Sequence, residues 1–379
     1  MSLFCASAAS QPAAVRQAAF EGQPALELDS GALELTVLLR GASIAAMRLC
    51  DDPTRLNPLW EPARMQRELG QPARAGGGTG HFVCVDGFGP VSPEERAAGL
   101  AGHGEAHRQQ FEVVFSGRRN GAAVLTLRAA LPAVQEVFTR TFRIADGGNV
   151  VWVESRLENL LAFDRPVNWA EHATAGSPFL EPGVTVVDVS ASRAQTRPYT
   201  EPSARQVRRR LASGADFTWP LAPGLDGKPV DLRVTPAELG TLDHATVLID
   251  PARRLGWVTA LHPGKRLIAG YLFRREEYPW LQFWGSFPST GKLARGLEFG
   301  TQPYDVPRRE AIGMGTLFGT PTYRWLPAKA AIESRFLMFY ARLPEGFRET
   351  GDVRLEAGKL VVENRGAKLR VELPASGEL

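Results

Sequence analysis

An alternation of apolar and polar residues recurs along almost the whole chain and constrains the fold more than any other feature. Between residues 136 and 143, Phe138 and Phe142 fall on one face of an extended segment, while threonines and an arginine fall on the other. Because successive side chains of a strand point to opposite faces, this pattern predicts β-strands. Similar runs predict strands at residues 111–115, 124–131, 151–157, 184–189, 245–249, 255–261, 267–273, 281–287, 332–340, 353–355, 360–362 and 368–373.

The turn residues support an all-β fold. The 379 residues include 38 Gly and 28 Pro, and Gly, Pro, Asp and Asn cluster between the apolar runs, as at residues 146–149 and 223–227. Such clusters divide a chain into short strands. Helical signals are confined to residues 93–100, 202–212 and 236–239. So many short strands predict a large β-sandwich or a barrel.

The domain organisation follows from what lies between the strands. No stretch is rich enough in Pro, Gly or Ser to separate two domains, and no sequence repeat is evident. We therefore expect residues 21–379 to form one domain, since β-sandwiches and barrels often exceed ordinary domain length. The first 20 residues are expected to be flexible. Residues from about 350 are expected to form a final pair of strands packed on the main body.

Charge and cysteine content exclude several classes of function. The net charge is +3, from 44 basic and 41 acidic residues, and the densest basic run, residues 205–210, reads as a solvated loop rather than a nucleic-acid site. No stretch approaches 18 consecutive apolar residues, so no membrane partner is expected. Cys5, Cys50 and Cys84 form no disulfide pattern, which favours a reducing compartment such as the cytoplasm. Neither HExxH nor GxSxG occurs, so no metal site or serine-hydrolase elbow is predicted.

Two histidines stand in segments that favour an accessible site. His103 lies between Gly102 and Gly104, which allow tight backbone geometry around the imidazole. His172 has small neighbours and would lie on the opposite strand face from Trp169 and Glu171. The alternatives are an exposed histidine in a turn for His103, and a buried core histidine beside a core Trp169 for His172.

Two carboxylates are the other candidates. Asp243 precedes the strand at residues 246–249, where an Asp is often only a turn residue. Glu298 lies between Leu297 and Phe299, and a carboxylate in an apolar strand is costly unless it is paired or used. Burial would raise its pKa toward neutrality, which suits a general base. The alternative for Glu298 is a buried salt bridge, to Arg295 or Arg143.

Taken together and in order, these segments resemble the galactose mutarotase (aldose 1-epimerase) superfamily from about residue 30 to 345. The resemblance is carried by HGEA at 103–106, NWAEHATAG at 168–176, LDHATV at 242–247 and GLEFGTQPYD at 296–305. NPLWEP at 57–62 and HFVCVDGFG at 81–89 look like the uncharacterised bacterial branch of the superfamily. An arginine that contacts the sugar in the family has no clear counterpart; Arg74 and Arg143 are candidates.

The resemblance implies a β-supersandwich enzyme that interconverts the α and β anomers of a small-molecule sugar, without a metal or cofactor. His172 would be the catalytic acid and Glu298 the catalytic base, facing each other across a gap as wide as a pyranose ring. The substrate-binding residues would be His103, Asp243, Glu171 and Trp169. Besides Trp169, the sugar could stack on Trp280 or Trp284, which could equally fill the core.

Three other functions remain open. The first is a non-catalytic carbohydrate-binding protein on the same fold. The second is a hexose-6-phosphate 1-epimerase, which would need converging arginines; Arg274 and Arg275 are the available pair. The third is a lyase or hydrolase using a second carboxylate or a tyrosine, with Glu171, Glu181 and Tyr304 as candidates. The sequence leaves the sugar and the oligomeric state undecided.

Overall fold

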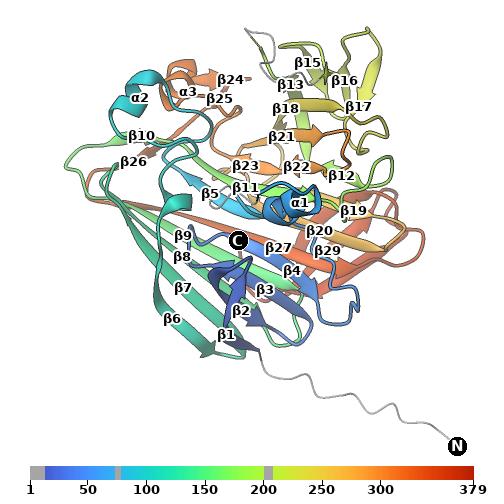
Figure 1. Cartoon of the computed structure of the whole chain (residues 1–379), viewed down its shortest axis with the longest axis horizontal. Coiled ribbons are helices and arrows are strands. Elements are labelled where there is room, and N and C mark those ends of the chain that lie inside the picture. Colours follow the sequence, from blue (N-terminus) through green and yellow to red (C-terminus); the bar gives the residue numbers. More distant parts are fainter. Residues whose placement is uncertain (1–12, 73–77, 200–207) are drawn as a thin grey trace, which may run out of the picture.

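Two large antiparallel sheets make up the computed structural model, which describes residues 13–72, 78–199 and 208–379 (Figure 1). The expected all-β sandwich is therefore confirmed. A single hydrophobic cluster joins the inner faces of both sheets, and Phe138 and Phe142 lie within it, as their alternation predicts.

Within the described residues the larger sheet has thirteen strands, and it includes the strands that carry His172 and Glu298. In spatial order its strands are β1 (Ala14–Phe20), β2 (Gln23–Asp29), β3 (Leu33–Leu38), β4 (Ile44–Leu49), β5 (His81–Val85), β11 (Trp169–Gly176), β22 (Ala294–Gly296), β21 (Trp280–Phe287), β18 (Thr241–Ile249), β13 (Ala191–Thr196) and β15 (Asp216–Thr218). In addition, β23 (Glu298–Gly300) pairs with β11 and β21, and β14 (Arg208–Arg209) pairs with β18.

The smaller sheet has eight strands. Their order is β12 (Val186–Val189), β19 (Leu255–His262), β20 (Leu267–Arg274), β27 (Ala331–Arg342), β9 (Val150–Asn159), β8 (Glu136–Ala145), β7 (Ala122–Leu131) and β6 (Glu112–Arg119). The described residues also form three two-stranded ribbons: β10 (Arg165–Val167) with β26 (Arg324–Leu326), β16 (Leu221–Pro223) with β17 (Pro229–Asp231), and β24 (Thr316–Leu317) with β25 (Thr320–Pro321).

Helices are few and short in the described residues: α1 (Pro62–Glu68), α2 (Pro93–Ala97), α3 (Arg308–Met314) and one 3₁₀ turn, η1 (Ala106–Arg108). The signal at 93–100 corresponds to α2, where Ser92 and Glu95 form a capping box. The other two expectations of helix are wrong where they can be checked. Residues 208–209 form β14, and residues 236–239 form no helix.

The C-terminal residues form three strands rather than the expected pair: β28 (Thr350–Glu356), β29 (Lys359–Asn364) and β30 (Arg370–Pro374). A second hydrophobic cluster joins them to the outer face of the smaller sheet, through side chains such as Trp152 and Trp257. Figure 1 shows these strands in red beside β19 and β20. This packing leaves the outer face of the larger sheet free for a site.

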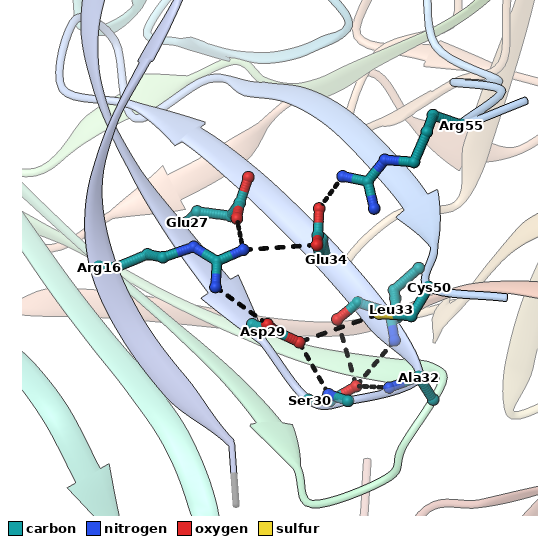
Figure 2. A network of polar contacts seen from close by, with 10 residues as sticks. Arg16, Glu27, Asp29, Ser30, Ala32, Leu33, Glu34, Cys50 and Arg55 are labelled. Atoms are coloured by element: carbon teal, nitrogen blue, oxygen red, sulfur yellow. Dashed lines mark hydrogen bonds and ion pairs between the residues drawn. The ribbon is translucent and has the colours of Figure 1, made fainter. Parts of the chain in front are cut away.

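The N-terminal edge corrects the expectation of a flexible segment over residues 1–20. Residues 1–12 lie outside the described residues, but Ala14–Phe20 form the edge strand β1. Figure 2 shows that Arg16 of β1 forms ion pairs with Glu27 and Asp29 of the adjacent strand β2 and with Glu34 of the next strand, β3. Exposed ion pairs each contribute little free energy, so this network mainly reinforces a strand pairing that the backbone ladder already makes.

A buried ionic cluster links the two sheets. It includes Glu171 and Trp169, two residues that were expected to bind substrate. Arg140 of β8 donates to Glu171 of β11 at 2.5 Å, and both side chains are fully buried. His81 and Tyr278 also contact the Glu171 carboxylate, and Trp169 donates its indole N–H to it. Both Glu171 and Trp169 are therefore core residues on the inner face and are fully buried, so the expectation that they bind substrate is corrected.

The free energy of unfolding should depend on this cluster. Glu171→Ala leaves the Arg140 guanidinium buried without its partner, which is expected to cost about 3–5 kcal/mol. Burial favours the neutral acid, but Arg140 and His81 outweigh it and lower the pKa of Glu171 from 4.5 to about 2. The contribution should therefore be complete above pH 4.5 and disappear as the pH falls toward 2.

Equilibrium urea denaturation of both proteins across this pH range measures the difference. Glu333→Ala, on an exposed part of β27, is the control and should change stability by about 0.5 kcal/mol or less. Equal stability losses in the two variants would contradict the role given to Glu171.

Candidate active site

A pocket of about 510 Å³ opens on the face of the larger sheet that points away from the core. Its described walls come from several strands and loops that are distant in sequence. They are Trp60, Gly78, Phe82, His103, His107, Arg108, His172, Gln282, Trp284, Glu298 and Asp305. Its volume lies within the range typical of small-molecule sites.

His172 reaches the pocket because β11 alternates. Glu171 points into the core, so His172 must point to the opposite face. Its ring stacks on Phe82, which lies directly opposite on β5, with 4.2 Å between ring centroids. Its Nδ1 lies 3.1 Å from Thr174 Oγ1. These contacts orient the ring so that its Nε2 faces Glu298 on the neighbouring strand β23.

Glu298 lies beside His172, and the two groups are much closer than expected. Glu298 Oε1 is 3.2 Å from His172 Nε2. Gln282, directly opposite on β21, donates from Nε2 to Glu298 Oε2 at 2.8 Å. The expectation of a pyranose-wide gap between acid and base is therefore wrong, because β11 and β23 are adjacent strands. Arg295 instead donates to backbone carbonyls, so it is not the partner of Glu298.

Burial determines the protonation of this pair. It raises the pKa of Glu298 well above its ordinary value, although the Gln282 hydrogen bond opposes the rise. It lowers the pKa of His172 well below its ordinary value, with a further contribution from His103. Both shifts favour a neutral imidazole next to a protonated carboxyl group. In this state the two groups together hold one titratable proton. They hold the same number when the carboxylate is ionised and the imidazole is protonated.

His103 lies at the same pocket, as expected. Its φ of +62° is in the left-handed region, and its backbone N–H donates to Gly89 O at 2.8 Å. Gly104, which follows at φ +74°, packs so closely on Val85 that a Cβ there would overlap the Val85 carbonyl. The His103 ring lies 5.3 Å from that of His172, centroid to centroid, and Nδ1 is 3.6 Å from the Cys84 Sγ. Burial lowers the pKa of His103.

Asp243 does not lie at the pocket, and this expectation is corrected. It is opposite Gly285 on β21, whereas the next residue, His244, is opposite the pocket residue Trp284. Directly opposite residues share a face, so Asp243 lies on the other face of the sheet. There it forms an ion pair with Arg210. The sequence motif located a strand that reaches the pocket. Successive side chains of a strand point to opposite faces, so a shift of one residue decides whether a side chain faces the pocket or the core.

Trp60 and Asp305 were missed by sequence reasoning, and Gln282 was not singled out. Trp60 packs edge to face on Trp284, with 6.1 Å between centroids. Of the tryptophans considered, Trp284 lines the pocket, while Trp169 and Trp280 are fully buried. The period of two from Trp284 identifies Gln282 on the same face, but no local signal identifies the two loop residues.

Other candidate residues lie elsewhere. Arg143 lies over Trp152 and reaches a backbone carbonyl of residue 376, and Arg74 lies outside the described residues. Within the described ranges, no group of three His, Cys, Asp or Glu side chains could hold a metal ion. The described helices include none that is long and apolar enough to span a membrane.

The close approach of Gly296 to Glu298 gives a test of the pair's geometry. A Cβ at Gly296 would overlap the Glu298 carboxyl group, so Gly296→Ala should displace that group from His172. A crystal structure of the variant would show the displacement directly. Gly313→Ala is the control because a Cβ there meets no atom within 4 Å. An unmoved carboxyl group in Gly296→Ala would contradict the geometry described.

The fold is identified by comparison with solved structures. No protein-family model matches the sequence, and no curated protein sequence matches it either. Among solved structures, an aldose 1-epimerase candidate from Klebsiella pneumoniae aligns with a TM-score of 0.62 at 13% identity, over 86% of this chain and 83% of that one.

Two further structures are similar. A galactose mutarotase-like protein from Clostridium acetobutylicum aligns with a TM-score of 0.58 at 11% identity, over 88% of this chain and 99% of that one. A galactose mutarotase related enzyme from Lactobacillus acidophilus aligns with a TM-score of 0.56 at 13% identity, over 84% and 97%. At these identities the similarity concerns the architecture, and the chain has the galactose mutarotase-like fold.

Proposed function

We propose that this protein is an aldose 1-epimerase that interconverts the α and β anomers of a free sugar by acid–base ring opening. The observation that carries the proposal is the contact between His172 Nε2 and Glu298 Oε1, 3.2 Å apart at the wall of an open pocket. The names of the similar structures support the same chemistry. The sparse cysteines, of which Cys50 and Cys84 are free thiols, support a reducing compartment such as the cytoplasm.

Adjacent groups suit this reaction because the two oxygens that exchange protons, O1 and O5, are both bonded to C1. One group removes the proton from the O1 hydroxyl while the other protonates O5, and the C1–O5 bond breaks as the C1=O1 bond forms. Rotation about C1–C2 followed by reclosure gives the other anomer. A positioned acid and base are all that these steps require.

The burial of the pair favours one order of proton transfer. Both shifts favour a proton on Glu298 rather than on His172 in the free protein. In the proposed order Glu298 therefore protonates O5 and His172 accepts the O1 proton, opposite to the roles expected from the resemblance. The pair then consists of a carboxylate and an imidazolium, and reclosure returns each proton to its original partner.

The surrounding residues support sugar binding. Trp60 and Trp284 present aromatic surface at the pocket, which suits the apolar face of a pyranose. His103 would hydrogen-bond the ring oxygen or a hydroxyl. For the proton-transfer steps themselves, no cofactor or metal is proposed.

The alternative enzymes have weaker support. Arg274 pairs with Glu277, and Arg275 donates to the backbone at Ile249; neither lines the pocket, so they do not provide a phosphate site there. Among the described residues, Arg108 is the arginine that lines the pocket, so sugar phosphates stay in the test panel. The residues considered for a lyase or hydrolase already have partners. Glu181 is paired with His262 and Lys265, and Tyr304 donates to Gln195.

Anomerisation should depend on both members of the pair. Glu298→Gln and His172→Ala should each reduce the rate about 10²–10⁴-fold, the usual contribution of a positioned acid or base. Polarimetry or NMR exchange on D-glucose, D-galactose and their 6-phosphates measures it. Glu181→Gln is the matched control, because it alters another Glu–His pair, at 2.8 Å, outside the pocket.

Two outcomes would reject this proposal. Full activity of Glu298→Gln would remove the pair from the mechanism. Sugar binding by the wild-type protein, detected by NMR titration, without faster anomerisation would identify a non-catalytic carbohydrate-binding protein.

The rate should also have a broad optimum in pH. The one-proton pair is lost at low pH, where His172 binds a second proton, and at high pH, where Glu298 loses its proton. The acid limb should lie well below 6.5 and the alkaline limb well above 4.5, the ordinary values for the two groups. Gln282→Leu removes a hydrogen bond that lowers the pKa of Glu298, so the alkaline limb of kcat/KM should move to higher pH. A shift to lower pH would contradict the assignment.

A further inference from the structure

Phe82 covers one face of the His172 ring. The side chains of β5 alternate, so His81 joins the buried Glu171 cluster while Phe82 lines the pocket. The pairing of β5 with β11 places Phe82 directly opposite His172. The ring centroids are 4.2 Å apart, and the ring planes differ by 21°. The two rings are therefore stacked face against face rather than edge against face.

Close packing holds the Phe82 ring in this orientation. A Cβ at Gly78 would overlap the ring, and the His103 and His107 rings lie 5.9 and 5.4 Å from it, centroid to centroid. Phe82 is 5% exposed and His172 is 8% exposed. The stacked contact is therefore constrained on several sides and shielded from water.

The proposed reaction places a positive charge on His172. Glu298 offers a carboxylate 3.2 Å from Nε2, but Nδ1 contacts the uncharged hydroxyl of Thr174 at 3.1 Å. Burial opposes the charge, and so do the nearby histidines. The titratable and charged side chains near His172 or at the same pocket are His81, Cys84, His103, His107, Arg108, Glu298 and Asp305. One face of the imidazole is left, and Phe82 covers it.

An aromatic face attracts a cation. The π-system of a phenyl ring is electron-rich on its face, and a cation within about 6 Å of the ring centroid is attracted to it. The His172 ring lies within this range. A neutral imidazole gains less from the same contact because it carries no net charge. The attraction is therefore strongest after His172 has accepted the O1 proton, and an interaction that strengthens during the reaction accelerates it.

We propose that Phe82 is a positioning residue that stabilises the His172 imidazolium during turnover by a cation–π interaction. Phe82 acts through His172 and need not contact the sugar. This inference rests on the proposed function for the step in which His172 becomes charged, but the effect of Phe82 on the protonation of His172 does not depend on catalysis.

Fluorinated phenylalanines at position 82 test the proposal. Mono-, di- and trifluorinated rings have nearly the shape of phenylalanine, but each fluorine withdraws electron density from the ring face and weakens its attraction for a cation. The kcat for D-glucose or D-galactose, measured by polarimetry, should fall with each fluorine while KM changes little. Phe82→Leu removes the π-system and should reduce kcat about threefold to thirtyfold. If Phe82→Leu does not fold, the fluorinated series decides.

The protonation of His172 gives a second measurement that does not require activity. A weaker attraction makes the imidazolium less favourable, so the pKa of His172, followed by NMR titration of its labelled ring, should fall with each fluorine. The acid limb of kcat/KM should move to lower pH for the same reason. The same series at Phe163, which is 59% exposed and outside the pocket, is the control and should change neither property.

A kcat and a His172 pKa that do not vary with fluorination would overturn the inference, as would equal losses in the Phe163 series. A kcat that rises with fluorination would also overturn it, because His172 would then be losing rather than gaining its charge in the slow step. A wild-type protein without anomerisation, in which the pKa of His172 still falls with fluorination, would reject the proposed function and leave the cation–π contact standing.

Discussion

The Glu171 carboxylate, buried between the two sheets, is the contact on which the site depends. It accepts from Arg140 of the opposite sheet and from Trp169 of its own strand. An unpaired charge at this depth would be strongly unfavourable, so the pairing with Arg140 of β8 fixes which face of β11 points into the core. Since neighbouring side chains of a strand point in opposite directions, the same orientation directs His172 to the pocket.

Two fully buried glutamates show how the surroundings decide the role of a carboxyl group. Glu171 has a guanidinium partner, so its pKa falls to about 2 and it remains charged. Glu298 has the Gln282 amide and a histidine, and burial raises its pKa. A neutral amide stabilises a carboxylate less than a cation does. The first glutamate therefore stabilises the fold, whereas burial makes the second easier to protonate, which suits the acid–base role proposed for it.

The two Arg–Asp pairs make a similar contrast. Asp243 with Arg210 and Asp305 with Arg197 have the same chemistry, yet only the second pair lies at the pocket. The first lies on a strand face determined by the pairing of β18 with β21. The second follows β23, in a loop that Gln282 anchors. Ion pairing and residue type do not separate them; the place of each aspartate in the fold does, and it leaves Asp243 more buried than Asp305.

The sequence by itself determined the all-β class, the strands of the smaller sheet and the three C-terminal strands, because a period of two is a local property that each segment displays alone. It did not predict β1 to β5 of the larger sheet. It did locate His103, which lies between glycines in a tight turn. Only the tertiary structure decided that Glu171 and Trp169 belong to the core, that Asp243 faces away from the pocket, and that Trp60 and Asp305 reach it. Alternation in the sequence shows only that neighbouring side chains of a strand point in opposite directions. Which of these directions is inward depends on the packing of strands and loops that are distant in the chain.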